Sequence, residues 1–357
     1  MKERNLGVDC LRILSMFMIV VYHLLVHGGL WDLFPSMSAP YLSVWALTLV
    51  SCSAVDVFIL IAGYVGVYSS RRFSQIASLW LQVFVYSLGV TLFFSLFTSA
   101  NITSDHFRTA LFPVTRDQYW FFTKYFGLFL FMPLINRAVV SSRKREMGLC
   151  LAAILLFFSF VQAFLRSNTY GTSDGYSLIW MIVLYAIGAY VRHHGFLVKA
   201  SRHALALSWF AFTLITFLLK MASQQVAVLG EIFPADLFTS YVSPTNWFSA
   251  LLLLALFSRI RIPARAGKLV SFLSTGAFSV YLVHDHPLFR KHIIADRFDF
   301  LADMPLPAFI ASLLLCAAGI YLLCAAADVL RRKVFDLLRI RNALGYVDRR
   351  IKSWMEA

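Results

Sequence analysis

The chain has 357 residues, of which 60% are hydrophobic and only 14% are charged, and its formal net charge is +14. A soluble domain carries about 25% charged residues, so this composition excludes an ordinary soluble domain. It predicts an all-α, polytopic membrane protein. The five cysteines lie in or beside apolar runs without metal-binding spacing, and we interpret them as small buried hydrophobic residues.

Ten apolar runs are long enough to cross a bilayer and predict about ten transmembrane helices. They lie at residues 10–27, 42–68, 75–98, 119–139, 147–165, 176–192, 203–222, 243–258, 268–285 and 305–330. With the N-terminus in the cytoplasm, the cytoplasmic segments hold 23 Lys and Arg residues and the outside segments hold 7. The positive-inside rule therefore predicts that both termini are cytoplasmic. The basic excess then serves orientation and contact with anionic membrane lipid, and nucleic acid is not an expected partner.

Two units follow from this pattern. Residues 1–330 form one integral-membrane domain without an internal repeat. Its first span is expected to stay uncleaved, because no small-residue cleavage site follows His27. Residues 331–357 alternate apolar and basic positions, which predicts a basic amphipathic tail on the cytoplasmic leaflet.

The first span carries Arg12 and, eleven residues later, His23. Ionisable side chains are costly in hydrocarbon, so both are functional candidates. At 1.5 Å per residue they lie roughly 16 Å apart, with Arg12 near the cytoplasmic face and His23 near mid-membrane. A structural histidine that bonds a neighbouring helix is the alternative. Because imidazole titrates near neutrality, His23 is a candidate general base that accepts a proton from a hydroxyl.

Asp56, in the second span, lies at a depth similar to that of His23 when both are counted from the membrane faces. A carboxylate beside an imidazole orients the ring and stabilises its protonated form. We therefore predict that Asp56 orients His23.

Arg12 also has two interpretations. It is either an interface anchor paired with Asp9, three residues earlier, or the group that grips a phosphorylated donor from the cytosol. A guanidinium fork suits the second role. Arg71 and Arg72, at the cytoplasmic end of the second span, would reinforce such a site, although the orientation rule also accounts for them.

The fourth span begins with Trp120, Lys124 and Tyr125. An outer aromatic belt explains the two aromatic residues, whereas Lys124 within the span is harder to explain structurally.

The ninth span ends with His284, Asp285 and His286. Adjacent helix positions do not converge on one ion, so no metal site is expected there.

Five stretches together resemble one family. VDCLRILSMFMIVVYH (8–23), which holds the Arg12 and His23 pair, is similar to the first-helix signature of the acyltransferase 3 family of bacterial membrane O-acyltransferases. Four more match in the family's order: VDVFILIAGY (55–64), YWFFTKYFGLFLFMP (119–133), MIVLYAIGAYV (181–191) and SVYLVH (279–284). Ala62 and Ile59 depart from the family's usual Ser and Phe, so a hydroxyl role at position 62 is absent.

The resemblance implies a single-domain, multi-pass O-acyltransferase of the cell inner (plasma) membrane, with residues 1–330 as the acyltransferase domain. The donor would be cytoplasmic acyl-CoA, acetyl-CoA first, used as a substrate without any permanently bound cofactor. The acceptor would be a hydroxyl of a surface or lipid-linked polysaccharide. His23 and Asp56 would be catalytic, and the candidates for donor or substrate binding are Arg12, Arg71, Arg72, Trp120, Lys124, Tyr125 and His284.

Direct transfer and an acyl-histidine intermediate both fit these residues. The main alternative is a polysaccharide exporter with a buried Arg, His and Asp relay. A transporter more often shows inverted repeats and broken helices in matched positions, and the sequence has no such pairing. A receptor-like or structural membrane protein leaves the five ordered matches unexplained.

Overall fold

The computed structural model describes residues 4–69, 73–197 and 199–356, and these residues form helices and loops without a strand. The α-helices are α1 (Leu6–His27), α2 (Ala39–Cys52), α3 (Ala54–Gly66), α4 (Phe73–Phe97), α5 (Ser104–Leu111), α6 (Trp120–Ser141), α7 (Lys144–Leu155), α8 (Gln162–Leu165), α9 (Leu178–His194), α10 (Arg202–Gln225), α11 (Ala227–Ile232), α12 (Pro244–Phe257), α13 (Ala264–His284), α14 (Pro287–Phe289), α15 (Leu306–Leu337) and α16 (Ile340–Glu356). Short 3-10 or π segments are η1 (Leu156–Val161), η2 (Ser173–Gly175), η3 (Ala235–Phe238), η4 (Arg290–Ile294) and η5 (Asp299–Asp303). The predicted all-α fold is confirmed.

Within the described ranges, seven helical segments are long and apolar enough to cross a membrane. They are Leu6–His27, Ala39–Gly66, Ser74–Phe97, Lys144–Leu165, Arg202–Gln225, Ala264–His284 and Leu306–Leu337. The three other predicted spans are helical too, as α6, the 17-residue α9 and the 14-residue α12. The chain is therefore a polytopic helical membrane protein, and the count of ten spans and the cytoplasmic termini stay predictions.

The second predicted span is built from two helices, because α2 ends and α3 begins on either side of Ser53. The Ser53 hydroxyl donates to the carbonyl of Val50 at 3.2 Å. Such bonds from a serine side chain compete with the helical backbone pattern. The break leaves Asp56 in the first turn of α3, where a helix favours a negative side chain.

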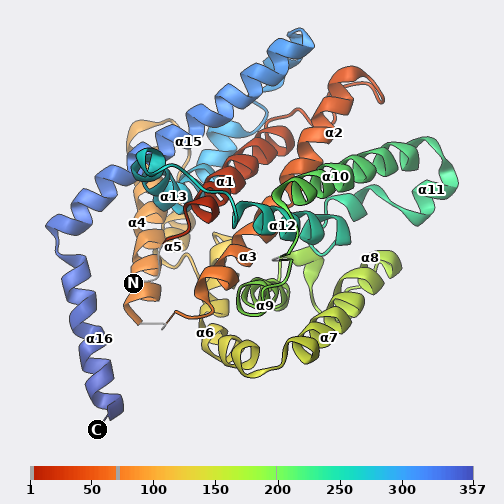
Figure 1. Cartoon of the computed structure of the whole chain (residues 1–357). Coiled ribbons are helices and arrows are strands. Elements are labelled where there is room, and N and C mark those ends of the chain that lie inside the picture. The colour runs from red at the N-terminus through yellow and green to blue at the C-terminus, as the bar shows by residue number, and fades with distance from the viewer. Residues whose placement is uncertain (1–3, 70–72, 198, 357) are drawn as a thin grey trace.

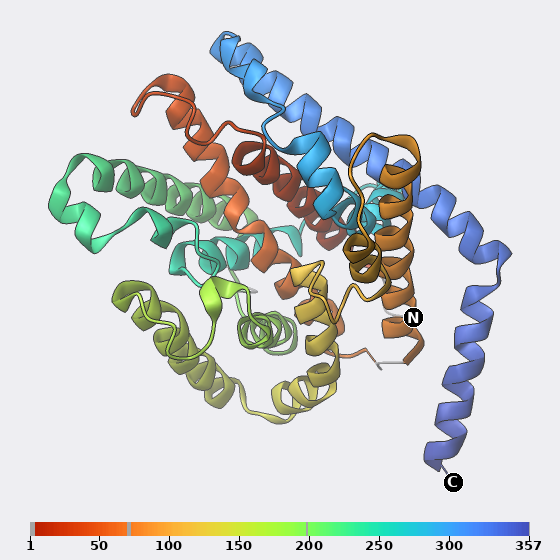
Figure 2. The same ribbon diagram turned by 180° about the vertical axis from the view of Figure 1, so that it is seen from behind.

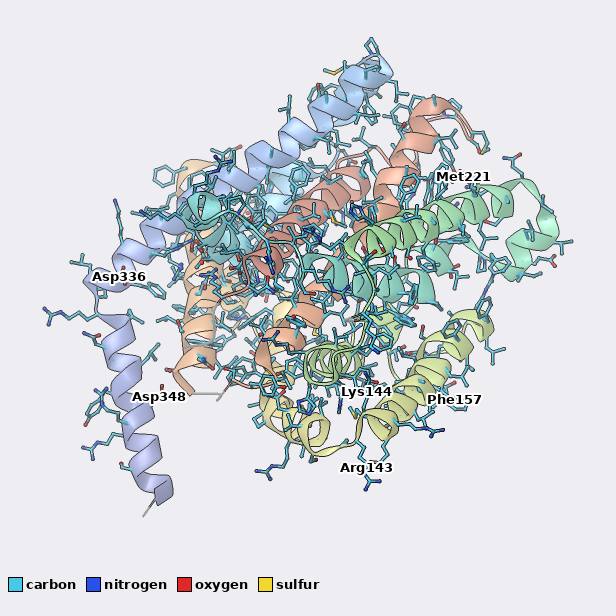
Figure 3. All side chains as sticks on the ribbon, viewed as in Figure 1. Arg143, Lys144, Phe157, Met221, Asp336 and Asp348 are labelled. Atoms are coloured by element: carbon cyan, nitrogen blue, oxygen red, sulfur yellow. The ribbon has the colours of Figure 1, made fainter. Side chains whose placement is uncertain are left out.

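The boundary expected at residue 331 falls inside α15, which continues to Leu337. Asp328, fully buried, holds this stretch helical by accepting from Arg331 Nε at 2.7 Å and from Arg332 Nε. A turn follows at Leu338 and Arg339, and α16 forms the amphipathic helix. Figures 1 and 2 show α16 turned away from the bundle, beside α4. Asp348 of α16, labelled in Figure 3, accepts from the backbone N–H of Ser74 at 2.8 Å.

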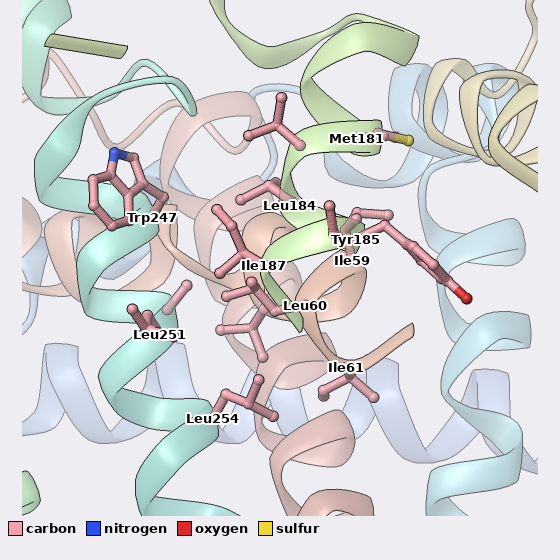
Figure 4. Close-up of a cluster of buried hydrophobic side chains, with 14 of the residues drawn as sticks. Ile59, Leu60, Ile61, Met181, Leu184, Tyr185, Ile187, Trp247, Leu251 and Leu254 are labelled. Atoms are coloured by element: carbon pink, nitrogen blue, oxygen red, sulfur yellow. The ribbon is translucent and has the colours of Figure 1, made fainter. Parts of the chain in front are cut away.

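One hydrophobic cluster packs α3 and α12 against α9 (Figure 4). Two glycines allow α3 and α9 to approach closely. A Cβ added at Gly63 would lie 2.0 Å from the carbonyl oxygen of Tyr185, and one at Gly188 would lie 2.1 Å from that of Leu60. Since both obstacles are backbone atoms, only glycine permits this helix crossing.

A second cluster joins α1 to α13 and α15, with members such as Leu24, Val280 and Leu313. Helix α1 lies near the middle of the bundle in both ribbon views. Its central and later residues belong to this second cluster, whereas Val8 and Leu11 belong to the first. This packing brings the end of α13 beside His23.

Candidate active site

His23 lies against the end of α13. Its Nδ1 is 3.1 Å from Nε2 of His284 and 3.7 Å from Oδ1 of Asp285. The two imidazole centroids are 5.0 Å apart. The His284 and Asp285 side chains are almost entirely buried, while 15% of the His23 side-chain surface stays exposed. The structure thus brings His23 into contact with His284, which lies 261 positions later in the sequence.

The hydrogen bonds determine which nitrogen of each ring carries the proton. Nδ1 of His284 lies 2.6 Å from the carbonyl oxygen of Val280, and a carbonyl oxygen can only accept. Nδ1 of His284 is therefore the donor, which leaves its Nε2 as an acceptor. Nδ1 of His23 must then donate to that Nε2. Nε2 of His23 keeps a free lone pair, which is the state a general base requires.

A cavity of about 230 Å³, which we call the His23 cavity, adjoins this ring. His23, Tyr22 and Trp120 line it together with Asp285 and Arg290. Nη1 of Arg290 donates to Oδ1 of Asp285 at 3.2 Å. This ion pair fixes the orientation of the carboxylate that faces His23.

Asp56 lies elsewhere. Its Oδ1 accepts from Trp180 Nε1 at 3.3 Å, and its Oδ2 has no hydrogen-bond partner among the residues that the structure describes. No hydrogen bond or ion pair joins these two described residues, Asp56 and His23. In the structure, Asp285 is the carboxylate that faces His23, in place of the predicted Asp56. The prediction compared depths alone, whereas in the structure Asp56 turns toward Trp180 of α9.

Arg12 is held by α13 as well as by its own helix. Its Nη1 donates to Oδ1 of Asp9 at 2.9 Å and to Oγ of Ser274 at 3.1 Å. The Ser274 hydroxyl in turn donates to Asp9 at 2.9 Å. The predicted pairing with Asp9 is present, and 28% of the Arg12 side chain stays exposed to two cavities.

Two further arginines, Arg4 and Arg192, line a cavity together with Arg12. Arg4 pairs with Asp9 through Nε, and Arg192 donates from Nη1 to the Tyr64 hydroxyl at 3.2 Å. This cavity, which we call the Arg192 cavity, has a volume of about 470 Å³. Three guanidinium groups and one carboxylate line this cavity, so it carries a net positive charge suited to an anionic ligand. Arg71 and Arg72, predicted to reinforce this site, lie outside the described residues.

Trp120 and Tyr125 both face cavities, but different ones. Trp120 lines the His23 cavity, where its ring lies 4.5 Å from that of Tyr176. Tyr125 lines a cavity of about 430 Å³ with Arg12, the Arg12 cavity. Lys124 instead pairs with Asp117 of the preceding loop at 2.8 Å and lines none of these cavities.

Four cavities follow one another through the molecule, because neighbouring cavities share lining residues. The Arg192 and Arg12 cavities share Arg12 and Val65. The Arg12 and His23 cavities share three phenylalanines: Phe58, Phe121 and Phe278. The His23 cavity shares Tyr22 and Tyr176 with a fourth cavity of about 350 Å³, the Asp236 cavity. The site therefore has an arginine-rich end and, beyond His23, a polar end.

A family model described as an acyltransferase domain, Acyl_transf_3, matches residues 5–330. The chain belongs to the acyltransferase 3 family. Neither the curated proteins nor the solved structures include a significant match to it. The matched region of this membrane acyltransferase contains every lining residue of the four cavities except Arg4, and it ends within α15, before α16.

Sequence reasoning about this acyltransferase missed Asp285, Arg290 and Arg192 as site residues. Asp285 and Arg290 lie in and just after a polar stretch at the end of the ninth predicted span, and their five-residue spacing was the available signal. Arg192 is one of the 23 basic residues in the predicted cytoplasmic segments, and the sequence pattern assigns it no other role. It shares α9 with Gly188, whose close packing on α3 sets it near Tyr64.

His286, next to Asp285, belongs to a separate structural contact. Its Nε2 lies 3.0 Å from Gln118 Nε2 and 3.3 Å from the carbonyl of Ser87. His284 and His286 thus turn to different partners and do not form a shared site.

Proposed function

We propose that this acyltransferase moves an acetyl or other short acyl group from acyl-CoA to a hydroxyl of a surface or lipid-linked polysaccharide, with His23 as general base. The observation that carries the proposal is the hydrogen-bond chain from Val280 through His284 to His23, which leaves Nε2 of His23 unprotonated beside a cavity. We propose the inner membrane as its location.

The arginine-rich end would receive the donor. The phosphates of acyl-CoA would lie against Arg4, Arg12 and Arg192, since guanidinium groups bind phosphate through paired hydrogen bonds. The thin pantetheine arm would enter the Arg12 cavity and direct the thioester toward His23. Because the donor arrives whole and CoA leaves, no resident cofactor is required.

The chemical step is a proton transfer coupled to nucleophilic attack. Nε2 of His23 removes the proton of the acceptor hydroxyl while its oxygen attacks the thioester carbonyl. The carbon–sulfur bond breaks, the ester forms, and the proton passes from His23 to the leaving thiolate. The positive charge on the ring is stabilised by Asp285, 3.7 Å from Nδ1. An acyl-histidine route would use the same lone pair as the nucleophile.

The Asp236 cavity would admit the acceptor. Its lining combines Asp174, Asp236 and Asn168 with the ring of Tyr176. Carboxylates and amides suit the hydroxyl groups of a sugar, and an aromatic face suits its apolar side. Tyr176 also lines the His23 cavity, so a sugar bound at this ring could present one hydroxyl to the base.

The test uses the purified full-length protein in detergent with radiolabelled acetyl-CoA and a surface-glycan extract. We expect label to reach glycan with the wild type, and His23→Ala to lose about 10²–10⁴-fold of the rate. His203→Ala is the matched control, because His203 is exposed at the start of α10. Equal transfer by His23→Ala and wild type would overturn the role of the base.

The same preparation separates the transferase from the exporter. If wild type labels no glycan, yet vesicles containing it move glycan across the membrane, the transferase proposal is wrong. The buried Arg, His and Asp side chains would then serve a relay.

A further inference from the structure

Three phenylalanines stand between the donor side of the site and its base. Phe58 of α3, Phe121 of α6 and Phe278 of α13 line both the Arg12 cavity and the His23 cavity. All three are partly exposed to these cavities. The three residues come from three different helices, so we expect an acyl group that travels from the Arg12 cavity to His23 to pass their rings.

Two of the three rings contact each other directly, and a tyrosine ring links the third to them. Phe58 and Phe121 meet edge to face with centroids 6.3 Å apart. The ring of Tyr281 lies between Phe121 and Phe278, with its centroid 5.7 Å from that of Phe121 and 6.1 Å from that of Phe278. Aromatic pairs at such distances attract each other with a small favourable energy. That energy holds a closed arrangement and is small enough for the rings to part.

We infer that Phe58, Phe121 and Phe278 form an aromatic gate that keeps water from the donor thioester and limits the length of the acyl group reaching His23. The inference rests on the proposed function and adds specificity residues to it. Purely apolar rings offer water no hydrogen-bond partner, so a closed gate disfavours a continuous water path between the two cavities.

Neighbouring rings support two of the three gate residues from behind. Phe121 stacks on Tyr125 with planes 13° apart, and Phe278 contacts Phe122 at 5.8 Å. Within the described part of the chain, the only aromatic ring that contacts Phe58 is that of Phe121, and Phe58 also packs against the second hydrophobic cluster. Phe58 thus has the fewest aromatic neighbours of the three, and we expect its truncation to open the gate.

An open gate permits a defined side reaction. Water attacks the thioester carbonyl, the carbon–sulfur bond breaks, and the products are the free carboxylic acid and CoA with a protonated thiol. In the closed enzyme, CoA is released only as glycan is acylated. The molar ratio of CoA released to glycan acylated therefore reports the state of the gate.

The experiment compares purified wild type with Phe58→Ala and Phe121→Ala. CoA release is followed with a thiol reagent, glycan acylation with radiolabelled acetyl-CoA, and length selection with butyryl-CoA. Phe126→Ala is the control, because Phe126 is one turn or so along α6 from Phe121 and lines neither cavity. Phe121→Leu is included as a milder variant, and gel filtration and melting temperature verify folding.

We expect wild type and Phe126→Ala to release about one CoA per acyl group transferred. Phe58→Ala and Phe121→Ala should release several-fold more, and their butyryl-to-acetyl rate ratio should rise about tenfold, the range in which pockets discriminate added methylenes. Folded Phe58→Ala and Phe121→Leu with wild-type values of both ratios would overturn the gate. Absence of transfer by the wild type itself would instead overturn the proposed function.

Discussion

His284 controls which nitrogen of His23 is available. Its Nδ1 is bound to the Val280 carbonyl, so its Nε2 can only accept, and Nδ1 of His23 can only donate. Without this acceptor, the proton of His23 can move to Nε2 and abolish the base. The geometry assigns His284, which sequence reasoning had grouped with binding residues, to positioning the ring.

We predict that His284→Ala lowers kcat with little change in the KM for acetyl-CoA. Loss of the acceptor leaves a buried N–H unpaired, at a cost of about 1–3 kcal/mol, or roughly tenfold to a hundredfold in rate. His284→Gln restores an oxygen acceptor and should recover part of the loss. Steady-state kinetics measure kcat and KM for both variants. An unchanged kcat in His284→Ala would exclude a positioning role for His284.

A second residue-scale prediction compares two carboxylates. Asp285 faces Nδ1 of His23 at 3.7 Å, whereas Asp56 accepts, among the described residues, only from Trp180. We expect Asp285→Asn to lose about tenfold to a hundredfold in kcat, because the charge that stabilises the protonated ring is gone. Asp56→Asn keeps an oxygen for Trp180 and should stay within a few-fold of wild type. The reverse order of kcat values would return Asp56 to the catalytic role predicted from sequence.

At the scale of elements, the crossing of α3 and α9 is the tightest constraint. Gly63 and Gly188 lie in two of the stretches that match the family, and both bring backbone to backbone. The family signature at these positions therefore has a packing reason. The crossing also sets Asp56 of α3 against Trp180 of α9.

We predict that Gly188→Ala destabilises the protein by about 1–3 kcal/mol or more, as overpacking does in tight interiors. The new methyl carbon would meet the Leu60 carbonyl oxygen at 2.1 Å. Gly89→Ala in α4 is the matched control, since nothing lies within 4 Å of its added Cβ. That control should be neutral or more stable, because alanine favours helix. Melting temperatures in detergent test this, and equal values for both variants would contradict it.

The elements also show what sequence could and could not provide. Hydropathy predicted every long helix, because a segment in hydrocarbon must satisfy its own backbone hydrogen bonds. It did not detect the break at Ser53, where the Ser53 hydroxyl donates to the Val50 carbonyl. Depth along a span matched Asp56 to His23, but depth is a single coordinate and does not give the face of the helix. The contact between His23 and His284 depends on which helices pack together, and single-sequence periodicity does not encode that.

On the scale of the whole molecule, charge and polarity differ between the two ends of the cavity series. One end is lined by Arg4, Arg12 and Arg192 with the single carboxylate of Asp9. The other end is lined by Asp174 and Asp236 with the single guanidinium of Arg166. His23 and the aromatic gate lie between them. A donor and an acceptor could therefore be bound at once without competing, which predicts that substitutions at the two ends affect different kinetic constants.

This separation can be measured with two donors. Acetyl-CoA carries phosphates and acetyl-pantetheine does not, although both present the same thioester. Arg12→Lys keeps the charge but loses the planar fork, and Arg192→Ala loses both. We expect each to raise the KM for acetyl-CoA about tenfold, as the loss of one charge-assisted bond of roughly 1.5 kcal/mol implies. Neither should change the KM for acetyl-pantetheine by more than about twofold.

Asp236→Ala, at the opposite end, should raise the KM for the glycan acceptor and leave both donor constants unchanged. If Arg192→Ala weakens acetyl-pantetheine as much as acetyl-CoA, the arginines act through the fold rather than on the phosphates, and the donor end is wrongly assigned. If Asp236→Ala changes the KM for the donors and leaves the KM for the glycan acceptor unchanged, the two ends of the cavity series do not bind separate substrates. Because each purified variant supplies all three KM values, this comparison tests the direction of the reaction through the molecule as well as the individual side chains.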